Sequence, residues 1–184
     1  GEIRDQETAG IAVNSAMTGH LVLSTLHAND AATTLPRLLD MGIEPFLVSS
    51  TVNVIIAQRL VRKICDKCRA SYALSEQEKN LIAGDERLKD ALAKHGTKDL
   101  EKTRFYAGSG CDACSRTGYA GRVGIFEVLE MSDAIRSLVA GRAPSGDIIK
   151  KAIEGGMTTM LEDGIDKVLR GVVTLGEVLQ ATME

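Results

Sequence analysis

The stretch HLVLSTLHAND, residues 20–30, is the strongest indication of the fold of the first third of this chain. Its first seven residues form a short, mainly apolar run that Gly19 precedes and the polar residues HAND follow. A run of this length between turn signals is typical of a buried strand in a parallel sheet. We therefore predict a buried strand over residues 20–26.

Helices are predicted on both sides of this strand. The Ala-rich residues 6–17 precede it, and Asn29 or Asp30 can cap a second helix that continues through Leu39. A third helix is predicted from Phe46 to about Ala57. Because strand and helix signals alternate, the sequence predicts an α/β unit with a mainly parallel sheet.

Length, composition and charge limit the classes of protein to consider. The 184 residues, 44% of them hydrophobic, are enough to bury one sizeable core, as one domain or a domain with an appendage. A net charge of −3 and 3% aromatic residues argue against a nucleic-acid surface. No apolar run approaches the roughly 20 residues that span a bilayer, and no N-terminal signal is present. We expect a cytosolic protein.

The middle of the chain has a different composition. Residues 65–114 are polar and charged, with helical signals over residues 76–82 and 86–94. Ser75 and Glu78 have the spacing of a capping box at the start of the first of these helices. This composition indicates an inserted subdomain rather than a continuation of the sheet.

The last third returns to regular structure. RVGIFEVL, residues 122–129, predicts a strand, and amphipathic helices are expected to start near Ser132, Ser145, Thr159 and Thr174. We predict that they form a small helical bundle, in which Leu161, Ile165, Val168 and Leu169 share one core-facing side. The chain is accordingly divided into residues 1–64, 65–121 and 122–184.

All four cysteines of the chain fall into two CxxC pairs: Cys65 with Cys68, and Cys111 with Cys114. Each pair can direct two thiolates at a tetrahedral Zn²⁺ at about 2.3 Å, so two pairs make a closed structural site with no position for water. Two disulfides or four free thiols are the alternatives. In a cytosolic chain this spacing favours zinc, which would fix the base of the inserted subdomain.

Two side chains are candidates for catalysis. Glu2 lies in GEIRD, where a strand before the first helix would end, and His27 follows the strand over residues 20–26. In open parallel sheets ligands bind beyond the carboxyl ends of the strands, so Glu2 and His27 are expected at one edge. His20 would lie roughly 23 Å from His27 along the strand, and we expect a structural role for it.

The order of four motifs resembles the secretion ATPase superfamily. They are GEIRDQET, TGHLVLSTLHANDA, AQRLVRKIC with its CxxC, and GRVGIFEVL, which together span essentially the whole chain. Within the superfamily the resemblance is to the type II secretion and type IV pilus assembly ATPases. It implies part of a RecA-like P-loop NTPase sheet, with an inserted tetracysteine zinc subdomain and a C-terminal helical bundle.

The resemblance also implies roles for single residues. Gly1 and Glu2 match the end of the Walker B motif, whose glutamate polarises the attacking water beside Mg²⁺. Residues 20–27 match the histidine box, which places His27 near the γ-phosphate. Arg37 and Arg122 match arginines of the nucleotide or subunit interface. Their alternatives are a helix-surface charge for Arg37 and a strand-end charge for Arg122.

The chain departs from the family pattern in its phosphate-binding loop, and it also lacks the upstream acidic motif and arginines that the family supplies. No GxxxxGK[ST] sequence, which grips the β- and γ-phosphates, occurs in it. We therefore expect it to be the C-terminal part of the motor domain and inactive alone, whereas the full-length protein would bind ATP and Mg²⁺ and hydrolyse ATP.

The resemblance further implies a homo-hexameric ring, peripheral to the inner membrane on its cytoplasmic side. It would drive pseudopilin or pilin assembly with inner-membrane platform and cytoplasmic-domain components of the machine. The tetracysteine motif favours a secretion or extension motor, because retraction motors of the family generally lack it. Two alternatives stay open: a zinc-dependent protein-interaction module without enzymatic activity, and a related DNA-pumping ATPase, which the acidic balance disfavours.

Overall fold

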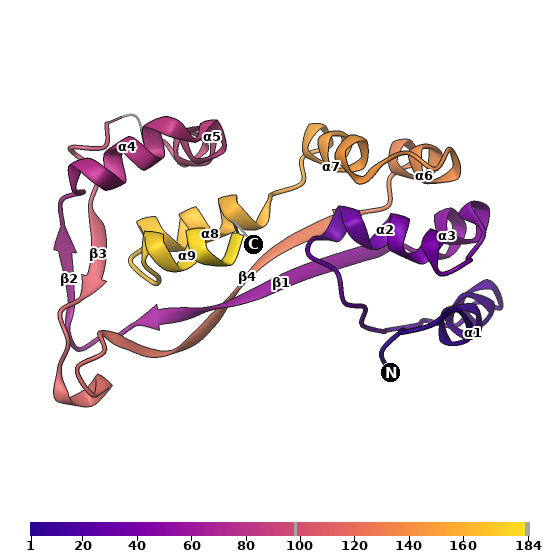
Figure 1. Ribbon diagram of the computed structural model, residues 1–184, viewed down its shortest axis with the longest axis horizontal. Helices are drawn as coiled ribbons and strands as arrows, with labels where there is room; N and C mark the ends of the chain where they lie inside the picture. The colour runs from indigo at the N-terminus through magenta and orange to yellow at the C-terminus, as the bar shows by residue number, and fades with distance from the viewer. Residues whose placement is uncertain (98, 183–184) are drawn as a thin grey trace. The chain divides into compact units, whose positions relative to one another are not determined.

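A computed structural model describes residues 1–97 and 99–182, which form two compact units (Figure 1). Unit 1 consists of Gly1–Ala57 and Glu127–Thr158, and unit 2 of Gln58–Phe126 and Thr159–Glu184. Within the described ranges, every helix is too short or too polar to cross a bilayer. Each unit combines helices with part of a small sheet, so the described chain has a mixed α/β fold.

Unit 1 is mainly helical. Its helices are α1 (Gln6–Met17), α2 (Ala31–Asp40), α3 (Pro45–Thr51), α6 (Asp133–Ala140) and α7 (Ser145–Glu154). Local caps explain why two of them start where they do: Asp5 accepts from the Thr8 amide at 2.8 Å, and Asp30 forms a capping box with Thr33. The helices predicted on either side of residues 20–26 are therefore confirmed.

The core of unit 1 joins segments distant in sequence. Helix α3 packs on α6, and α2 packs on α7. Fully buried side chains at its centre include Leu35, Val48 and Leu129. Burying each side chain of this size stabilises the fold by about 1.5–3 kcal/mol.

One long strand pair runs through both units. Strand β1 (Val54–Ile64) pairs with β4 (Tyr119–Glu130). The Met131 amide donates to the Asn53 carbonyl at 3.0 Å, and the Cys65 amide donates to the Gly118 carbonyl at 2.9 Å. The start of β1 thus lies beside the end of β4, and the end of β1 beside the start of β4, so the two strands run antiparallel.

Strand β1 corrects the third predicted helix. That helix was expected to reach Ala57, but α3 ends at Thr51 and residues 54–64 are strand. In β1 exposed side chains alternate with partly or fully buried ones, a period of two that suits its β-branched residues. The predicted strand over residues 122–129 is confirmed, with β4 extending beyond it at both ends.

The predicted strand over residues 20–26 was wrong for the described chain. In the described chain, the one strand-like pairing of residues 20–26 is a parallel bridge between Glu2 and Thr25. Leu21 and Leu23 are 85% and 83% exposed. A buried strand needs hydrogen-bonded neighbours and a covering layer on each face, and the described residues supply neither in full. For the same reason they do not form the mainly parallel sheet that we predicted.

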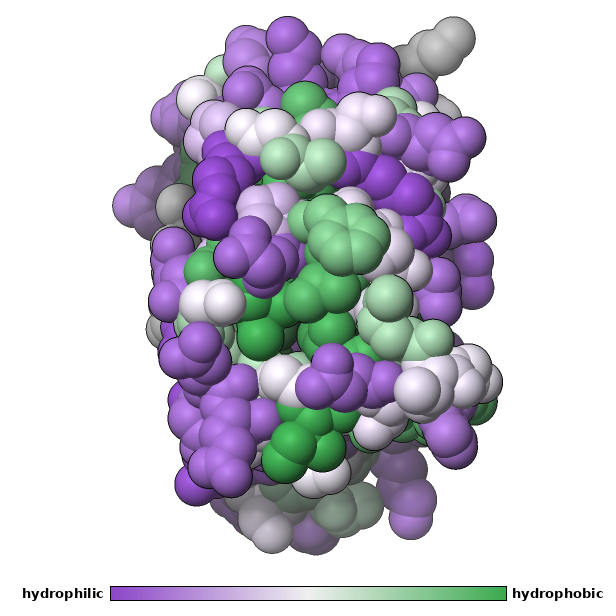
Figure 2. All heavy atoms as spheres, turned by 90° about the vertical axis from the view of Figure 1, so that its right-hand side faces the viewer, coloured by the Kyte–Doolittle hydropathy of each residue, from purple (hydrophilic) through white to green (hydrophobic). Residues whose placement is uncertain are grey.

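Unit 1 also exposes apolar side chains on its helices. Ile11, Met17 and Phe46 are each more than half exposed, and the Ser50 hydroxyl contacts the Met17 sulfur at 3.9 Å. Figure 2 shows a face of the molecule on which apolar side chains gather among polar ones. Contiguous apolar surface of this kind is typical of protein contact sites.

Unit 2 contains the polar middle of the chain. Strand β2 (Arg69–Tyr72) pairs antiparallel with β3 (Phe105–Gly108), and helices α4 (Glu76–Gly84) and α5 (Glu86–Lys94) lie between them in sequence. The predicted capping box of Ser75 and Glu78 is present. Helix α5 packs on α8 (Met160–Leu169), which packs on α9 (Leu175–Thr182).

The four helices predicted for the tail all form. Ser132 and Thr159 cap α6 and α8 as expected. On α8, Ile165 and Val168 are buried, whereas the flanking leucines are only half-buried. By their packing contacts, α6 and α7 belong to unit 1 and α8 and α9 to unit 2, and the single helical bundle stays a prediction. The division at residues 64 and 121 stays a prediction.

Candidate functional site

Glu2 and His27 lie in contact in unit 1. The Nε2 atom of His27 is 2.7 Å from Glu2 Oε1, and the Arg4 guanidinium donates to Glu2 Oε2 at 2.6 Å. The structure thus brings together the acid and the imidazole that were expected at one edge. Their roles in catalysis stay predictions.

Backbone contacts hold these two side chains in register. The Ile3 amide donates to the Thr25 carbonyl at 2.8 Å, and the Ser24 hydroxyl donates to the Gly1 carbonyl. Residues 1–3 therefore lie alongside residues 24–25. His27 follows this contact by two residues, so the bridge sets how close its ring comes to Glu2.

The electrostatics favour a charged Glu2. The hydrogen bond from Arg4 and the charge of its guanidinium hold the pKa of the Glu2 carboxyl below its usual value. Glu2 Oε1 is buried yet has no hydrogen-bond partner among the described residues, so the approach of His27 is an electrostatic contact rather than a directed hydrogen bond.

Exposure differs sharply within the pair. The Glu2 side chain is 21% exposed, whereas that of His27 is 85% exposed. The ring is therefore placed by its backbone and by Glu2, and not by packing around it.

The two predicted arginines stand apart from these contacts. Arg37 is exposed on α2 in unit 1, and Arg122 is exposed on β4 in unit 2. Neither forms an ion pair with any residue of the described ranges. His20 makes a local contact, with its Nδ1 atom 3.0 Å from the Thr18 hydroxyl. The proposed roles of all three residues stay predictions.

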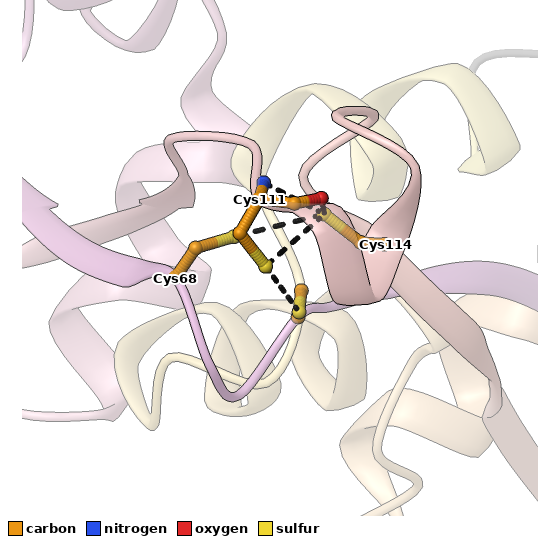
Figure 3. A group of neighbouring side chains, drawn as sticks. Cys68, Cys111 and Cys114 are labelled. Carbon is orange, nitrogen blue, oxygen red and sulfur yellow. Dashed lines mark hydrogen bonds between the residues drawn. The ribbon is translucent and has the colours of Figure 1, made fainter.

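The four cysteines converge in unit 2, and Figure 3 labels three of them, Cys68, Cys111 and Cys114. Their sulfurs all lie within 4.8 Å of one another, with separations of 3.9 Å for Cys65–Cys111 and Cys68–Cys114 and 3.8 Å for Cys111–Cys114. A disulfide needs about 2.05 Å, and all four are free thiols. Four sulfurs at about 2.3 Å from a tetrahedral ion would be about 3.8 Å apart, so the group fits zinc.

Two tight turns place these sulfurs. The Cys68 amide donates to the Cys65 carbonyl, and the Cys114 amide donates to the Cys111 carbonyl, both at 3.2 Å. The backbone amides of Cys111 and Gly118 also point at Cys114 Sγ, at 3.2 and 3.3 Å. Each CxxC turn therefore directs both of its sulfurs at one point.

The same amides affect ionisation. Hydrogen bonds from the backbone amides of Cys111 and Gly118 lower the pKa of the Cys114 thiol to about 6, which favours the thiolate that binds metal. Desolvation raises the pKa of the Cys68 thiol to about 11. A bound cation would favour the thiolate there too, because metal binding displaces thiol protons.

A close backbone crossing supports the second turn. A Cβ atom on Gly108 would lie 2.1 Å from the Gly118 carbonyl oxygen, and one on Gly118 would lie 2.6 Å from that of Gly108. Gly118 also has φ +79°, a conformation that favours glycine. The approach of β3 to the start of β4 therefore requires glycine at both positions.

Sequence analysis missed one buried acid, Glu127 on β4. It is 5% exposed, and its Oε1 atom accepts from the Ala31 amide at 2.6 Å. The available signal was its register in RVGIFEVL, where strand alternation puts Glu127 on the same face as the buried Leu129. A charged residue in an apolar register usually has a specific partner.

Known proteins are similar to this chain over nearly its whole length. The profile of the family described as "Type II/IV secretion system protein" matches residues 1–180. The type II secretion system protein E of Xanthomonas campestris pv. campestris is 48% identical over 182 residues, which are 99% of this chain and 30% of that protein. The type IV pilus assembly ATPase PilB of Thermus thermophilus is 42% identical over 185 residues, 100% of this chain and 20% of that protein.

Solved structures give a matching fold. The crystal structure of the pilus retraction motor PilT with bound ADP superposes with a TM-score of 0.61 at 24% identity, over 100% of this chain and 38% of that one. The ATPase DotB of Legionella pneumophila superposes with a TM-score of 0.58 at 18% identity, over 98% of this chain and 36% of that one. The chain thus spans between a fifth and about two fifths of the proteins it matches.

Proposed function

This chain belongs to the type II/IV secretion system protein family, and we propose that it is the C-terminal part of a motor ATPase. In this proposal it supplies the edge of a RecA-like sheet that carries Glu2 and His27, while the remainder of the full-length protein binds the phosphates of ATP. The observation that carries the proposal is the 2.7 Å contact between His27 Nε2 and Glu2 Oε1.

Glu2 is suited to orienting the attacking water. Phosphoryl transfer depends on positioning and charge stabilisation more than on covalent chemistry. The lowered pKa of Glu2 keeps it a carboxylate, and its Oε1 atom has no hydrogen-bond partner in the described ranges. A carboxylate can accept a hydrogen bond from water and hold the water in line with the γ-phosphate.

His27 is suited to contacting the γ-phosphate. Its ring touches Glu2 but is otherwise exposed, so a phosphate can reach it from the open side. When bound with the nucleotide, Mg²⁺ would neutralise charge on the β- and γ-phosphates. Arg37 and Arg122 are exposed cations without ion pairs within residues 1–97 and 99–182, which leaves them available for phosphate or for a neighbouring subunit.

The tetracysteine group has a structural role in this proposal. Four thiolates fill the coordination sphere of Zn²⁺ and leave no position for water or substrate. The sulfur separations of 3.8–3.9 Å support this assignment. The ion would fix the two CxxC turns and, with them, the base of the subdomain that contains α4 and α5.

The full-length protein would work as a hexameric ring on the cytoplasmic side of the inner membrane. There it would drive pseudopilin or pilin assembly with the platform and cytoplasmic-domain components of its machine. Two observations support a larger assembly: the relatives of 42–48% identity are secretion and pilus-assembly proteins, and unit 1 exposes Leu21, Leu23 and the apolar helix residues. The tetracysteine group favours a secretion or extension motor.

Phosphate release from Mg·ATP tests the proposal. We expect hydrolysis by the full-length protein and none by residues 1–184 alone, because the chain has no GxxxxGK[ST] sequence. Zinc binding by a full-length protein without hydrolysis would indicate an interaction module instead. Hydrolysis that requires DNA would indicate a DNA-pumping ATPase. Hydrolysis by residues 1–184 alone would contradict the expectation that another part of the full-length protein binds the phosphates of ATP.

A further inference from the structure

Glu127 is a buried carboxylate with no part in the hydrolysis proposed above. It lies on β4 and is 5% exposed. Burying a carboxylate is costly unless hydrogen bonds replace the lost water. Its contacts therefore show what the fold uses it for.

One of those contacts holds the start of α2. Glu127 Oε1 accepts a hydrogen bond of 2.6 Å from the Ala31 amide, across 96 positions of sequence. Ala31 is the first residue of α2, and its amide is one of the donors that a helix leaves without an internal partner. Asp30 also caps the N-terminus of α2, since its side chain accepts a hydrogen bond of 2.7 Å from the Thr33 amide. The first turn of α2 thus has one local and one distant carboxylate.

The segment that carries His27 lies directly before this turn. On one side it is fixed by the bridge between Glu2 and Thr25. On the other side it is fixed where Ala31 meets Glu127. Because the ring of His27 is 85% exposed, these two backbone anchors decide where it lies.

We propose that Glu127 is a positioning residue: by holding the Ala31 amide it sets the segment that places His27 against Glu2. The proposal rests on the ATPase function proposed above. The length of the Glu127 side chain matters because it brings the carboxylate oxygen to the Ala31 amide. A shorter acid, such as Asp, would keep the charge but move the acceptor away from the amide. Glu127 thereby connects the end of β4 with the segment that carries His27.

Variants of Glu127 in the full-length protein test this inference. We expect Glu127→Ala and Glu127→Asp to lower kcat for ATP about 10- to 100-fold, the size of effect that a displacement of about 1 Å can have. The KM for ATP should stay within about twofold, because the phosphate-binding motif lies elsewhere. Glu127→Gln keeps an oxygen at the same reach, and its kcat should stay within about threefold of wild type.

Glu162 offers a matched control. It is also a buried acid, 8% exposed, and it accepts from the Thr159 amide at 2.9 Å at the start of α8 in unit 2. We expect Glu162→Ala to lower the melting temperature but to leave kcat unchanged well below that temperature. An equal loss of kcat in Glu162→Ala and Glu127→Ala would mean a general structural effect and would overturn the inference.

The other outcomes are equally decisive. If Glu127→Ala does not fold, Glu127→Asp and Glu127→Gln decide: equal kcat values for these two overturn the inference. If wild type hydrolyses ATP, Glu2→Gln does not, and all Glu127 variants match wild type, only the positioning inference fails. If wild type itself does not hydrolyse ATP, the proposed function fails first.

Discussion

The tetracysteine group and the Glu2–His27 edge differ in how much of each this chain contains. Two short turns bring four sulfurs within 4.8 Å of one another, and Cys65 and Cys114 are buried. The Glu2–His27 contact, by contrast, depends on an extended segment that is held at its two ends, by the bridge to Glu2 and by the contact of Ala31 with Glu127, and whose Leu21 and Leu23 are exposed. A metal site can be complete within local turns, whereas a hydrolysis site must be assembled from segments far apart in a larger protein.

This difference has a physical basis. A CxxC turn fixes two ligands through its own backbone hydrogen bonds, so little else is required. Phosphoryl transfer needs a phosphate cradle, a metal and a positioned water at the same time. We therefore expect changes at the cysteines to act on stability and changes at the edge to act on rate.

The largest expected effect is loss of the metal. Structural zinc contributes on the order of 10 kcal/mol to small metal-bound folds at neutral pH. We expect a strong chelator, or Cys114→Ser, to remove one zinc per chain and to abolish cooperative unfolding of unit 2. Metal analysis and urea unfolding followed by circular dichroism measure the two effects. Added zinc should restore the chelated wild type but not Cys114→Ser, and unchanged unfolding after complete zinc removal would contradict a structural role.

The next largest effect is expected at the edge to which we assign hydrolysis. Glu2→Gln in the full-length protein should lower kcat by about 10²- to 10⁴-fold, the usual contribution of a general base, with little change in stability. Phosphate release and a melting curve measure both. Glu7→Gln, which changes an exposed acid in the first turn of α1, is the control. Equal rates for the two variants would remove Glu2 from the mechanism.

A smaller effect is expected where backbone geometry supports the second CxxC turn. Gly118→Ala places a Cβ 2.6 Å from the Gly108 carbonyl oxygen at φ +79°, and we expect it to cost about 1–3 kcal/mol of stability and to weaken zinc binding. Gly84→Ala, at a helical position with no neighbouring atom within 4 Å, should be neutral or slightly stabilising. Urea unfolding and a competitive zinc titration compare them, and equal behaviour would contradict the close crossing.

The smallest effect is expected from an ion pair in unit 2. Arg62 donates to Glu177 from its guanidinium at 2.6 Å and from its amide at 3.0 Å, and these hydrogen bonds hold the pKa of Glu177 below its usual value. Because the pKa of Glu177 is lower in the folded than in the unfolded state, the ion pair stabilises the fold at pH values above the unfolded pKa of about 4.3. This contribution is lost as the pH falls through the folded pKa.

Because Arg62 is half exposed, the contribution should not exceed about 1 kcal/mol. The free energies of unfolding of wild type and Glu177→Gln, compared between pH 3 and 6, measure the contribution of the ion pair. This range extends about one unit or more to either side of the unfolded pKa of Glu. The difference between the two proteins should shrink as pH falls. A difference that is constant with pH would contradict the ion pair.

The sequence predicted best what is encoded locally. The capping box of Ser75 with Glu78 forms as expected, and a helix starts near Thr159 as expected, because a cap involves only neighbouring residues. The cysteine spacing likewise predicted a cluster of four sulfurs. Each of these features needs only a few consecutive residues.

Features that depend on distant partners were predicted less well. Residues 54–64 have apolar residues that suit a helix or a strand, and pairing with β4 decides for the strand. Residues 20–26 have the composition of a buried strand, but their one bridge in the described chain is the one between Thr25 and Glu2. Glu127 was missed because its partner, Ala31, lies 96 positions away.

The most direct test of the account is a structure of the full-length protein with Mg²⁺ and a non-hydrolysable ATP analogue. We expect a Glu2 carboxylate oxygen within about 2.6–3.2 Å of a water in line with the γ-phosphate, and His27 within reach of a γ-phosphate oxygen directly or through one water. An analogue bound with both side chains more than about 10 Å from its γ-phosphate, beyond the reach of one bridging water, would contradict the assignment of this edge to hydrolysis.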